Sequence, residues 1–220
     1  MSFKNLKIAH TSDLHFRSLS RHDEVKSVFT QFAQQCKDMN VDHIFVGGDI
    51  YHTKTSGISP EYIDLMTWWL KTLSMVAPLH LTLGNHDGNL SNSTRQDAIS
   101  PIVDAVNLGN VYLYKNSGTY NFDVGYNWCV FSLFDKENWK NVKPVTGEIN
   151  IACYHGPVAG AVTETNWELT DGIDLEFFAP YDMVMLGDIH SRQYLDYKKR
   201  EILIDESELK LYPGAEIINE

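Results

Sequence analysis

The sequence predicts an α/β domain in which a parallel sheet with helices is followed by a second sheet. Three apolar segments of strand length alternate with helical segments in the first half of the chain, a pattern typical of parallel sheets. After Asn107 the pattern changes to short β segments separated by Gly, Asn and Pro. The 220 residues suit one large domain, given a prior of roughly 150 residues per domain, and we expect residues 1–220 to form one.

The first half contains three expected strands, which lie within residues 6–15, 41–50 and 78–87. Apolar residues at helical spacing predict helices within 21–38 and 59–76, and a further helix is expected near Gln96 to Val106. In the second of these helices Ser59 is the expected N-cap and Pro60 the expected first residue. The order strand, helix, strand, helix, strand, helix therefore predicts a parallel sheet core.

The second half contains short β segments, which we expect to add a second sheet: residues 110–114, 118–122, 127–134, 148–154 and 181–186. Cys36, Cys129 and Cys153 are scattered and lack the CxxC spacing of a zinc or redox site. We therefore expect them to be buried small hydrophobic residues, without a disulfide framework.

Composition and charge restrict the class of protein. Hydrophobic residues make up 43% of the chain, and no apolar run approaches the ~18 residues of a membrane span. The N-terminal residues do not resemble a signal peptide, so we expect a cytoplasmic protein without membrane contact. The formal charge of -11 argues against a basic surface that follows phosphates, unless the acids gather where divalent cations bind.

Polar residues able to bind metal ions follow five of the apolar strand segments, listed in chain order: Asp13 and His15; Asp49; Asn85, His86 and Asp87; His155; Asp188 and His190. In open α/β sheets ligands bind beyond the carboxyl ends of the strands. A set of Asp, His and Asn without Cys favours Mn, Fe, Mg or Zn. One carboxylate bridging two such ions, ~3.5–4 Å apart, would give an arrangement suited to phosphoryl transfer.

The motifs "DLH", "GGDI", "LGNHD", "YHG" and "GDIH", in this order, resemble those of the calcineurin-like metallophosphoesterase superfamily. They span nearly the whole chain. The resemblance implies a four-layer αββα sandwich, in which two mixed sheets are flanked by helices, and a two-metal phosphoesterase activity.

The resemblance also implies a role for each matching residue. Asp13, His15 and His190 would hold one metal, Asp49 would bridge, and Asn85 with His155 would hold the second metal. His86 matches the histidine that contacts the scissile phosphate and protonates or stabilises the leaving oxygen, while a metal-activated water attacks phosphorus. Asp87 would either orient His86 or have a purely structural role.

The chain departs from the superfamily at Asp188. The superfamily usually has Gly-His-x-His at this position, and Asp188 stands where the first His is expected. Because a carboxylate is a suitable ligand for Mn or Mg, we expect Asp188 to bind the second metal and to bias the site toward harder ions. The alternative is an aspartate that turns away from the metal.

Four further segments, "GGDIYHTKTSGISPEYIDLM", "SLFDKENW", "YHGPVAGA" and "KLYPGAEIINE", resemble the SbcD and Mre type of DNA-end nuclease, particularly its phage-like versions. This resemblance implies Mn-dependent exonuclease and endonuclease activity on DNA ends, with two divalent ions and an SMC-like ATPase partner of the SbcC type. It also implies that His52 faces the substrate, and Arg17 and Arg192 are further candidates for phosphate contact. The resemblance also implies a possible homodimer. Trp68 and Trp69 cannot both face one core, which leaves one aromatic either for such an interface or for packing under the second sheet or a loop.

Members of that family usually continue into a DNA-capping domain and an ATPase-docking segment, and we expect neither within residues 1–220. These residues would be either an isolated nuclease core or a naturally minimal protein that finds DNA differently, and we expect weak, salt-sensitive DNA binding. Two other functions remain open. A phosphoesterase for a small molecule or phosphoprotein would use the same metals and His86. A non-catalytic scaffold, like the retromer subunits of this fold, is favoured only by Asp188.

Overall fold

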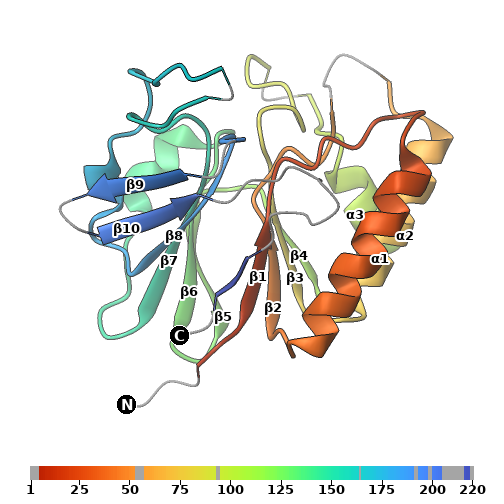
Figure 1. The fold of residues 1–220 in the computed structure, drawn as a ribbon, viewed down its shortest axis with the longest axis horizontal. Coiled ribbons are helices and arrows are strands. Elements are labelled where there is room, and N and C mark those ends of the chain that lie inside the picture. The colour runs from red at the N-terminus through yellow and green to blue at the C-terminus, as the bar shows by residue number, and fades with distance from the viewer. Residues whose placement is uncertain are drawn as a thin grey trace.

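The chain folds into two β-sheets that stack face to face, with three α-helices covering the outer face of the first sheet (Figure 1). This computed structural model describes residues 5–52, 57–92, 95–163, 165–190, 193–197, 200–204 and 216–218. The arrangement confirms the predicted α/β fold of two sheets flanked by helices. None of the described helices is long and apolar enough to cross a membrane.

The first sheet has the strand order β11-β1-β2-β3-β4. Its four parallel strands are β1 (Ile8–Thr11), β2 (His43–Val46), β3 (Leu79–Thr82) and β4 (Val111–Tyr114). β11 (Glu216–Ile218) pairs with β1 in antiparallel orientation. The helices that cover this sheet are α1 (His22–Asp38), α2 (Pro60–Ser74) and α3 (Ser100–Val106).

The second sheet has the order β5-β6-β7-β8. Its strands are β5 (Gly118–Asp123), β6 (Tyr126–Phe131), β7 (Ile149–His155) and β8 (Met183–Gly187), of which the last three run parallel. β5 is antiparallel to β6, so both sheets are mixed. Beyond β8 the chain forms the antiparallel pair β9 (Gln193–Tyr197) and β10 (Arg200–Ile204). Two short 3₁₀ helices, η1 (Lys136–Asn141) and η2 (Leu175–Phe178), contribute to the outer layer of this sheet.

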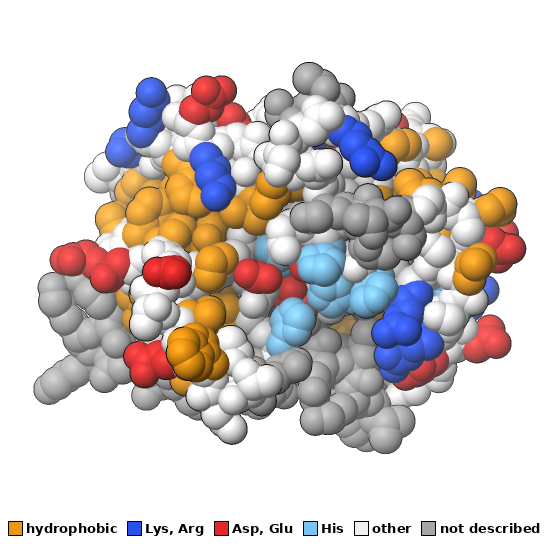
Figure 2. Space-filling view, turned by 90° about the horizontal axis from the view of Figure 1, so that it is seen from above, with side chains coloured by type: hydrophobic (Ala, Val, Ile, Leu, Met, Phe, Trp, Pro, Cys, Tyr) orange, Lys and Arg blue, Asp and Glu red, His pale blue; other side chains and the backbone are white. Residues whose placement is uncertain are grey.

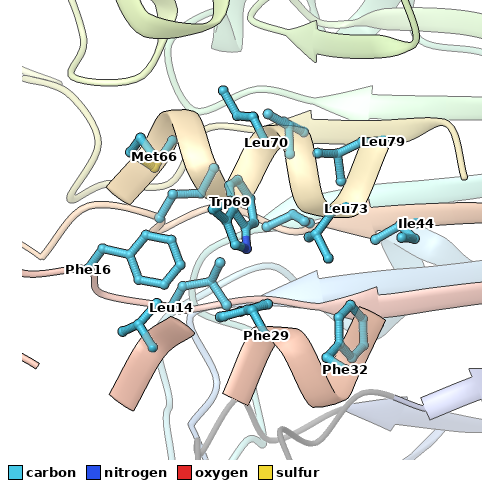
Figure 3. Packing of buried hydrophobic residues seen from close by; sticks show 14 of the residues in the cluster. Leu14, Phe16, Phe29, Phe32, Ile44, Met66, Trp69, Leu70, Leu73 and Leu79 are labelled. Atoms are coloured by element: carbon cyan, nitrogen blue, oxygen red, sulfur yellow. The ribbon is translucent and has the colours of Figure 1, made fainter. Parts of the chain in front are cut away.

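Apolar side chains fill the spaces between the layers. Trp69 of α2 is fully buried and meets Phe16 and Phe29 edge to face, with ring centroids 5.5 and 5.8 Å away (Figure 3). Trp68 is partly buried and packs against the same cluster, which supports a packing role for this aromatic. The three cysteines are buried and free, as expected. Because deletion of a buried aromatic side chain typically costs ~3–5 kcal/mol, the Trp69 cluster fixes the helices on the sheet.

The sequence predictions hold for most elements and fail at three places. Ser59 caps α2 as predicted, since its hydroxyl accepts the amide of Tyr62 at 3.1 Å. Helix α3 begins at Ser100, not at Gln96, and the Asp97 carboxylate accepts the amides of Ile99 and Ser100 in a turn that precedes the helix.

The other two differences concern strands. β4 belongs to the first sheet, not the second, because α3 is a crossover that returns the chain parallel to β3. β9, β10 and β11 were not predicted. Within the "KLYPGAEIINE" segment, only 216–218 lie among the described residues.

A buried polar network lies between the two sheets. The Nδ1 of His43 is 3.1 Å from the Nε2 of His80, and the Nδ1 of His80 is 2.9 Å from the hydroxyl of Tyr114. The Nε2 of His43 also lies 3.3 Å from an Asp123 carboxylate oxygen. These contacts indicate a structural role for His43 and His80. His10 is buried as well.

The pKa of His80 predicts a pH dependence of stability. Burial, and secondly His43, lower this pKa from 6.5 to about 3, so the folded state disfavours the charged ring. The stability contributed by neutral His80 is therefore present above pH 6.5 and is lost as the pH falls toward 3. We expect His80→Gln to make the decline in unfolding free energy between pH 6 and 4 shallower by up to about 1.4 kcal/mol per pH unit.

Chemical denaturation across this pH range measures the effect. Tyr114→Phe is the matched control, because it removes the hydroxyl partner of His80 without removing the imidazole. It should lower the unfolding free energy by about 1 kcal/mol at each pH, with an unchanged slope. A wild-type slope in His80→Gln would contradict the assignment.

Candidate metal centre

The loops after five strands bring the candidate ligands together at one edge of the two sheets. β1, β2 and β3 of the first sheet contribute Asp13, His15, Asp49 and Asn85, and β7 and β8 of the second contribute His155, Asp188 and His190. Ligand atoms within 4.8 Å of one another form three overlapping groups: Asp13, His15 and His190; His15, Asp49 and His86; and Asp13, Asp49, His155 and Asp188. Figure 2 shows the imidazole rings gathered with acidic side chains at the centre of this face.

Asp49 lies at the centre of the site and is only 1% exposed. Its Oδ1 accepts the backbone amide of His86 at 2.8 Å and lies 3.4 Å from the Nε2 of His155. Its Oδ2 lies 3.8 Å from the Nε2 of His15 and 3.9 Å from that of His86. One carboxylate therefore faces imidazoles from three different loops, which is the position expected of a bridging ligand.

His155 has a fixed orientation. Its Nδ1 lies 2.7 Å from the carbonyl oxygen of Gly47, so Nδ1 carries the proton that is donated. Its Nε2 then points to the Oδ1 of Asn85, 3.1 Å away, and to the carboxylates of Asp49 and Asp188. A backbone carbonyl that orients the second ring nitrogen is the usual support of a metal-binding histidine.

Four candidate ligands adopt left-handed backbone conformation. The φ angles are 55° at Asp13, 47° at His15, 49° at Asp49 and 74° at Asp188. This conformation costs non-glycine residues roughly 1–3 kcal/mol each when it is not relieved locally. Hydrogen bonds between the loops hold it, for example from the amide of His15 to the carbonyl of Asp49 at 2.9 Å. Left-handed residues that cluster in this way are typical of functional sites.

Glycines allow the loops to approach one another closely. A Cβ on Gly187 would lie 2.5 Å from the Nδ1 of His155, and one on Gly84 would collide with Asp49. Gly48 combines a positive φ of 98° with a Cβ position 2.7 Å from the same His155 nitrogen. Sequence reasoning missed these glycines as site residues, although a Gly directly before Asp49, Asn85 and Asp188 was the signal.

The residues present fit a pair of divalent metal ions. Both ring nitrogens of His15 are buried without a hydrogen-bond partner, which is costly unless another group binds there. Three carboxylates, of Asp13, Asp49 and Asp188, lie in the same cluster. Such closely spaced like charges favour cations between them. The oxygen and imidazole donors suit Mn, Mg, Fe or Zn.

The pKa values show how strongly the site attracts positive charge. Burial alone would lower the pKa of His155, but the Asp49, Asp13 and Asp188 carboxylates outweigh it and raise the pKa to about 10. Burial alone would raise the pKa of Asp13, but His190 and His155 outweigh burial and lower this pKa to about 2. The pKa of Asp188 is raised, by burial first, while His155 opposes the shift. In the absence of metal, protonated His155 therefore supplies the positive charge.

His86 is held by the backbone of His52 and not by Asp87. The Nδ1 of His86 lies 2.7 Å from the His52 carbonyl oxygen, so Nδ1 is the donor and Nε2 faces the site. The Asp87 carboxylate instead accepts the backbone amides of Tyr51 at 2.7 Å and Gly84 at 2.8 Å. Burial, and then the Asp49 charge, raise the pKa of Asp87 to about 8. Of the two roles left open for Asp87, these contacts support the structural one.

The three candidate substrate contacts are placed differently. The His52 ring lies 5.7 Å from that of His15 and carries a buried Nδ1 without a hydrogen-bond partner. Arg17 is exposed, and its charge lowers the pKa of His52 after burial does so. These two residues therefore lie beside the cluster. Arg192 lies outside the described residues.

Comparisons with known proteins identify relatives of the chain. The sequence profile of the calcineurin-like phosphoesterase family matches residues 6–194. An uncharacterised protein of Acanthamoeba polyphaga mimivirus, R555, is 40% identical over 209 residues, which cover 87% of this chain. The match covers 15% of the length of that viral protein.

Solved structures with a related fold have low sequence identity. The structure of GAP50, described as the anchor in the inner membrane complex of Plasmodium, has a TM-score of 0.56 and 12% identity, over 92% of this chain and 72% of that one. A novel archaeal phosphodiesterase has a TM-score of 0.45 and 16% identity, over 93% and 88% of the two chains. Nuclease MPE of Pseudomonas putida has a TM-score of 0.39 and 13% identity, over 74% and 66%.

The protonated state of His155 predicts proton release on metal binding. Because its pKa is about 10 before metal binds, the ring is charged at pH 7.5 and must lose a proton to become a ligand. Titration calorimetry with Mn²⁺ in two buffers of different ionisation enthalpy should report release of about one proton. The ion should also stabilise the fold by about 2.7 kcal/mol at a hundred times its Kd. Asp49→Asn should weaken both effects, and buffer-independent heats would contradict the assignment.

The close approach of Gly187 to the His155 ring predicts that an added methyl group at residue 187 disturbs metal binding. Gly187→Ala should push the His155 ring from its place and weaken Mn²⁺ binding about 10–100-fold, as loss of a ligand's support typically does. Gly109→Ala is the matched control, since a Cβ there meets no atom within 4 Å. Equal Mn²⁺ affinity of the two variants, measured by calorimetry, would show that the glycine is not needed.

Proposed function

The chain belongs to the calcineurin-like phosphoesterase family, a family of metal-dependent hydrolases, and from this premise we propose that it cleaves the phosphodiester bonds of DNA at strand ends with Mn²⁺. The family assignment covers most of the chain and agrees with the metal-binding groups. The proposal beyond this assignment is that DNA is the natural substrate and that Mn²⁺ is the natural metal. The motif resemblance to DNA-end nucleases and the accessibility of the site support them.

The exposure of the site to solvent is the observation that supports a polymeric substrate. The side chains of His86 and His190 are each 42% exposed, while Asp49 beneath them is 1% exposed. A phosphate within a long chain can therefore reach these imidazoles from outside, without entry into a closed cavity. Figure 2 shows this open arrangement of histidines on the surface.

His86 is positioned to act as the general acid. Because its Nδ1 donates to the His52 carbonyl, the protonated ring presents its Nε2–H toward the substrate. When bound, the divalent ions supply Lewis-acid catalysis and neutralise phosphate charge. In the reaction a P–O bond to water forms and the P–O bond to the leaving alcohol breaks. His86 gives its proton to the leaving oxygen, and a proton of the attacking water passes to solvent.

Asp188 supports the choice of Mn²⁺. Its carboxylate joins Asp13, Asp49 and His155 in one group of possible ligands, so the ligand alternative for Asp188 is favoured over an aspartate that turns away. An oxygen donor in place of an imidazole favours Mn²⁺ and Mg²⁺ over softer ions.

Arg17 and His52 are proposed to contact the phosphates that flank the cleaved bond. We also propose an SMC-like ATPase and a second copy of this chain as partners, on the resemblance alone. The formal charge of -11 implies that DNA binding through these residues is weak, and added salt should weaken it further.

Two other functions would use the same fold. A phosphoesterase acting on a small molecule or phosphoprotein fits the negative charge, because such a substrate needs no extended basic surface. GAP50 is described as an anchor, and the fold alone would permit a non-catalytic anchoring role for this chain. The complete set of ligand types and the fixed His86 favour catalysis over anchoring.

The nuclease proposal predicts Mn-dependent cleavage of end-labelled linear DNA. Degradation of single-stranded and double-stranded substrates should occur with Mn²⁺, less with Mg²⁺, and not without metal. His86→Ala should lower kcat by about 10²–10⁴-fold, the usual contribution of a general acid. Its Mn²⁺ affinity, measured by calorimetry, should stay within a few-fold of wild type.

Bis(p-nitrophenyl) phosphate separates the alternatives. Hydrolysis of this diester without any DNA cleavage would reject the nuclease and favour a smaller substrate. Inactivity on both compounds, with Mn²⁺ bound, would favour the anchor.

A further inference from the structure

A hollow of about 250 Å³ lies directly beside the metal-binding cluster. Asp188 and His190 form its inner wall, and Ile189, Ala161, Val162 and Leu169 make much of the remainder. Thr163 and Thr165 add hydroxyl groups at the outer side. Its volume is below the ~300–1,000 Å³ of pockets that hold drug-sized ligands, so it suits a single heterocycle.

The outer wall of the hollow belongs to a hairpin within residues 160–169. The amide of Leu169 donates to the carbonyl of Ala161 at 2.7 Å, and the amide of Thr163 donates to the carbonyl of Trp167 at 2.9 Å. The side-chain amide of Gln193 holds the hairpin from β9, since it bonds both the N–H and the C=O of Val162. The hairpin is therefore closed by its own hydrogen bonds and is held to β9 at Val162.

Trp167 is the exposed aromatic residue of this hairpin. Its relative exposure is 68%, whereas Trp69 and Trp128 are fully buried. The exposed indole offers an aromatic face on which another ring can stack. Figure 2 shows a hydrophobic area beside the histidines, on the side of the second sheet.

We propose that this hollow, together with Trp167 on its hairpin, is a subsite for one unpaired nucleobase of the substrate. The inference rests on the proposed function, because it takes the cleaved phosphate to lie at the metal-binding cluster. A base attached through its sugar to that phosphate must lie against a neighbouring wall. The hollow that shares Asp188 and His190 with the cluster is such a wall.

The chemistry of the hollow selects the class of ligand. Apolar walls and an indole ring favour the flat face of a base, and threonine hydroxyls can bond to its polar edge. A base paired within a duplex exposes no face to stack on. The subsite therefore selects frayed ends and single strands.

A pair of chromogenic diesters tests the subsite. Thymidine 5′-(p-nitrophenyl phosphate) carries a base, and methyl p-nitrophenyl phosphate carries none, while both release p-nitrophenolate. We expect wild type to prefer the first by at least tenfold in kcat/KM. Trp167→Ala should reduce this preference roughly tenfold, within the range of base stacking on an aromatic ring, and Trp167→Phe should retain most of it. Val124→Ala, at another exposed apolar residue, should keep the wild-type preference.

Tryptophan fluorescence gives a readout that does not depend on catalysis. Without divalent ions, oligo(dT) should quench the emission of wild type, an abasic oligomer of equal length should not, and the quenching should disappear in Trp167→Phe.

Equal kcat/KM for the two diesters in wild type, unchanged in Trp167→Ala, would overturn the subsite and leave the phosphodiesterase intact. Loss of hydrolysis of both diesters would reject the proposed function, and quenching would then decide on the subsite. Equal quenching by the abasic oligomer, or none by oligo(dT), would overturn it.

Discussion

The geometry of this protein depends on the approach of three imidazoles to one buried carboxylate, that of Asp49. His15, His86 and His155 come from three separate loops, yet each places its Nε2 within 3.9 Å of an Asp49 oxygen. Backbones cannot come this close when side chains intervene, so glycines precede the key residues. The same close approach is accompanied by left-handed backbone conformation at four candidate ligands, which costs conformational free energy. Hydrogen bonds between the loops hold this conformation, and bound cations would stabilise it further, which links the shape of the loops to metal binding.

Much of this arrangement follows from the sequence. Apolar runs located the five strands that precede the ligands in the first and second sheets, and the parallel direction of strands explains why their carboxyl ends meet. The N-cap at Ser59 could also be predicted, because Ser followed by Pro is typical of the first residues of a helix.

Two features that the sequence did not settle depend on contacts distant in sequence. The partner of His86 is a carbonyl 34 residues away, and Asp87 looks like that partner only from its position next to His86. Strand β4 has the same local pattern as the strands of the second sheet, and only its pairing with β3 assigns it to the first.

The hydrogen bond from His155 to the carbonyl of Gly47 joins residues 108 positions apart and connects the end of β7 with the end of β2. The ligand set is thus divided between the two sheets, and neither half of the chain carries it whole. An ion bound by ligands from both sheets would therefore hold the two sheets together at the edge where these strands end. Catalytic competence in such a protein appears only after the last tertiary docking step, so an incompletely folded chain has no active hydrolase centre.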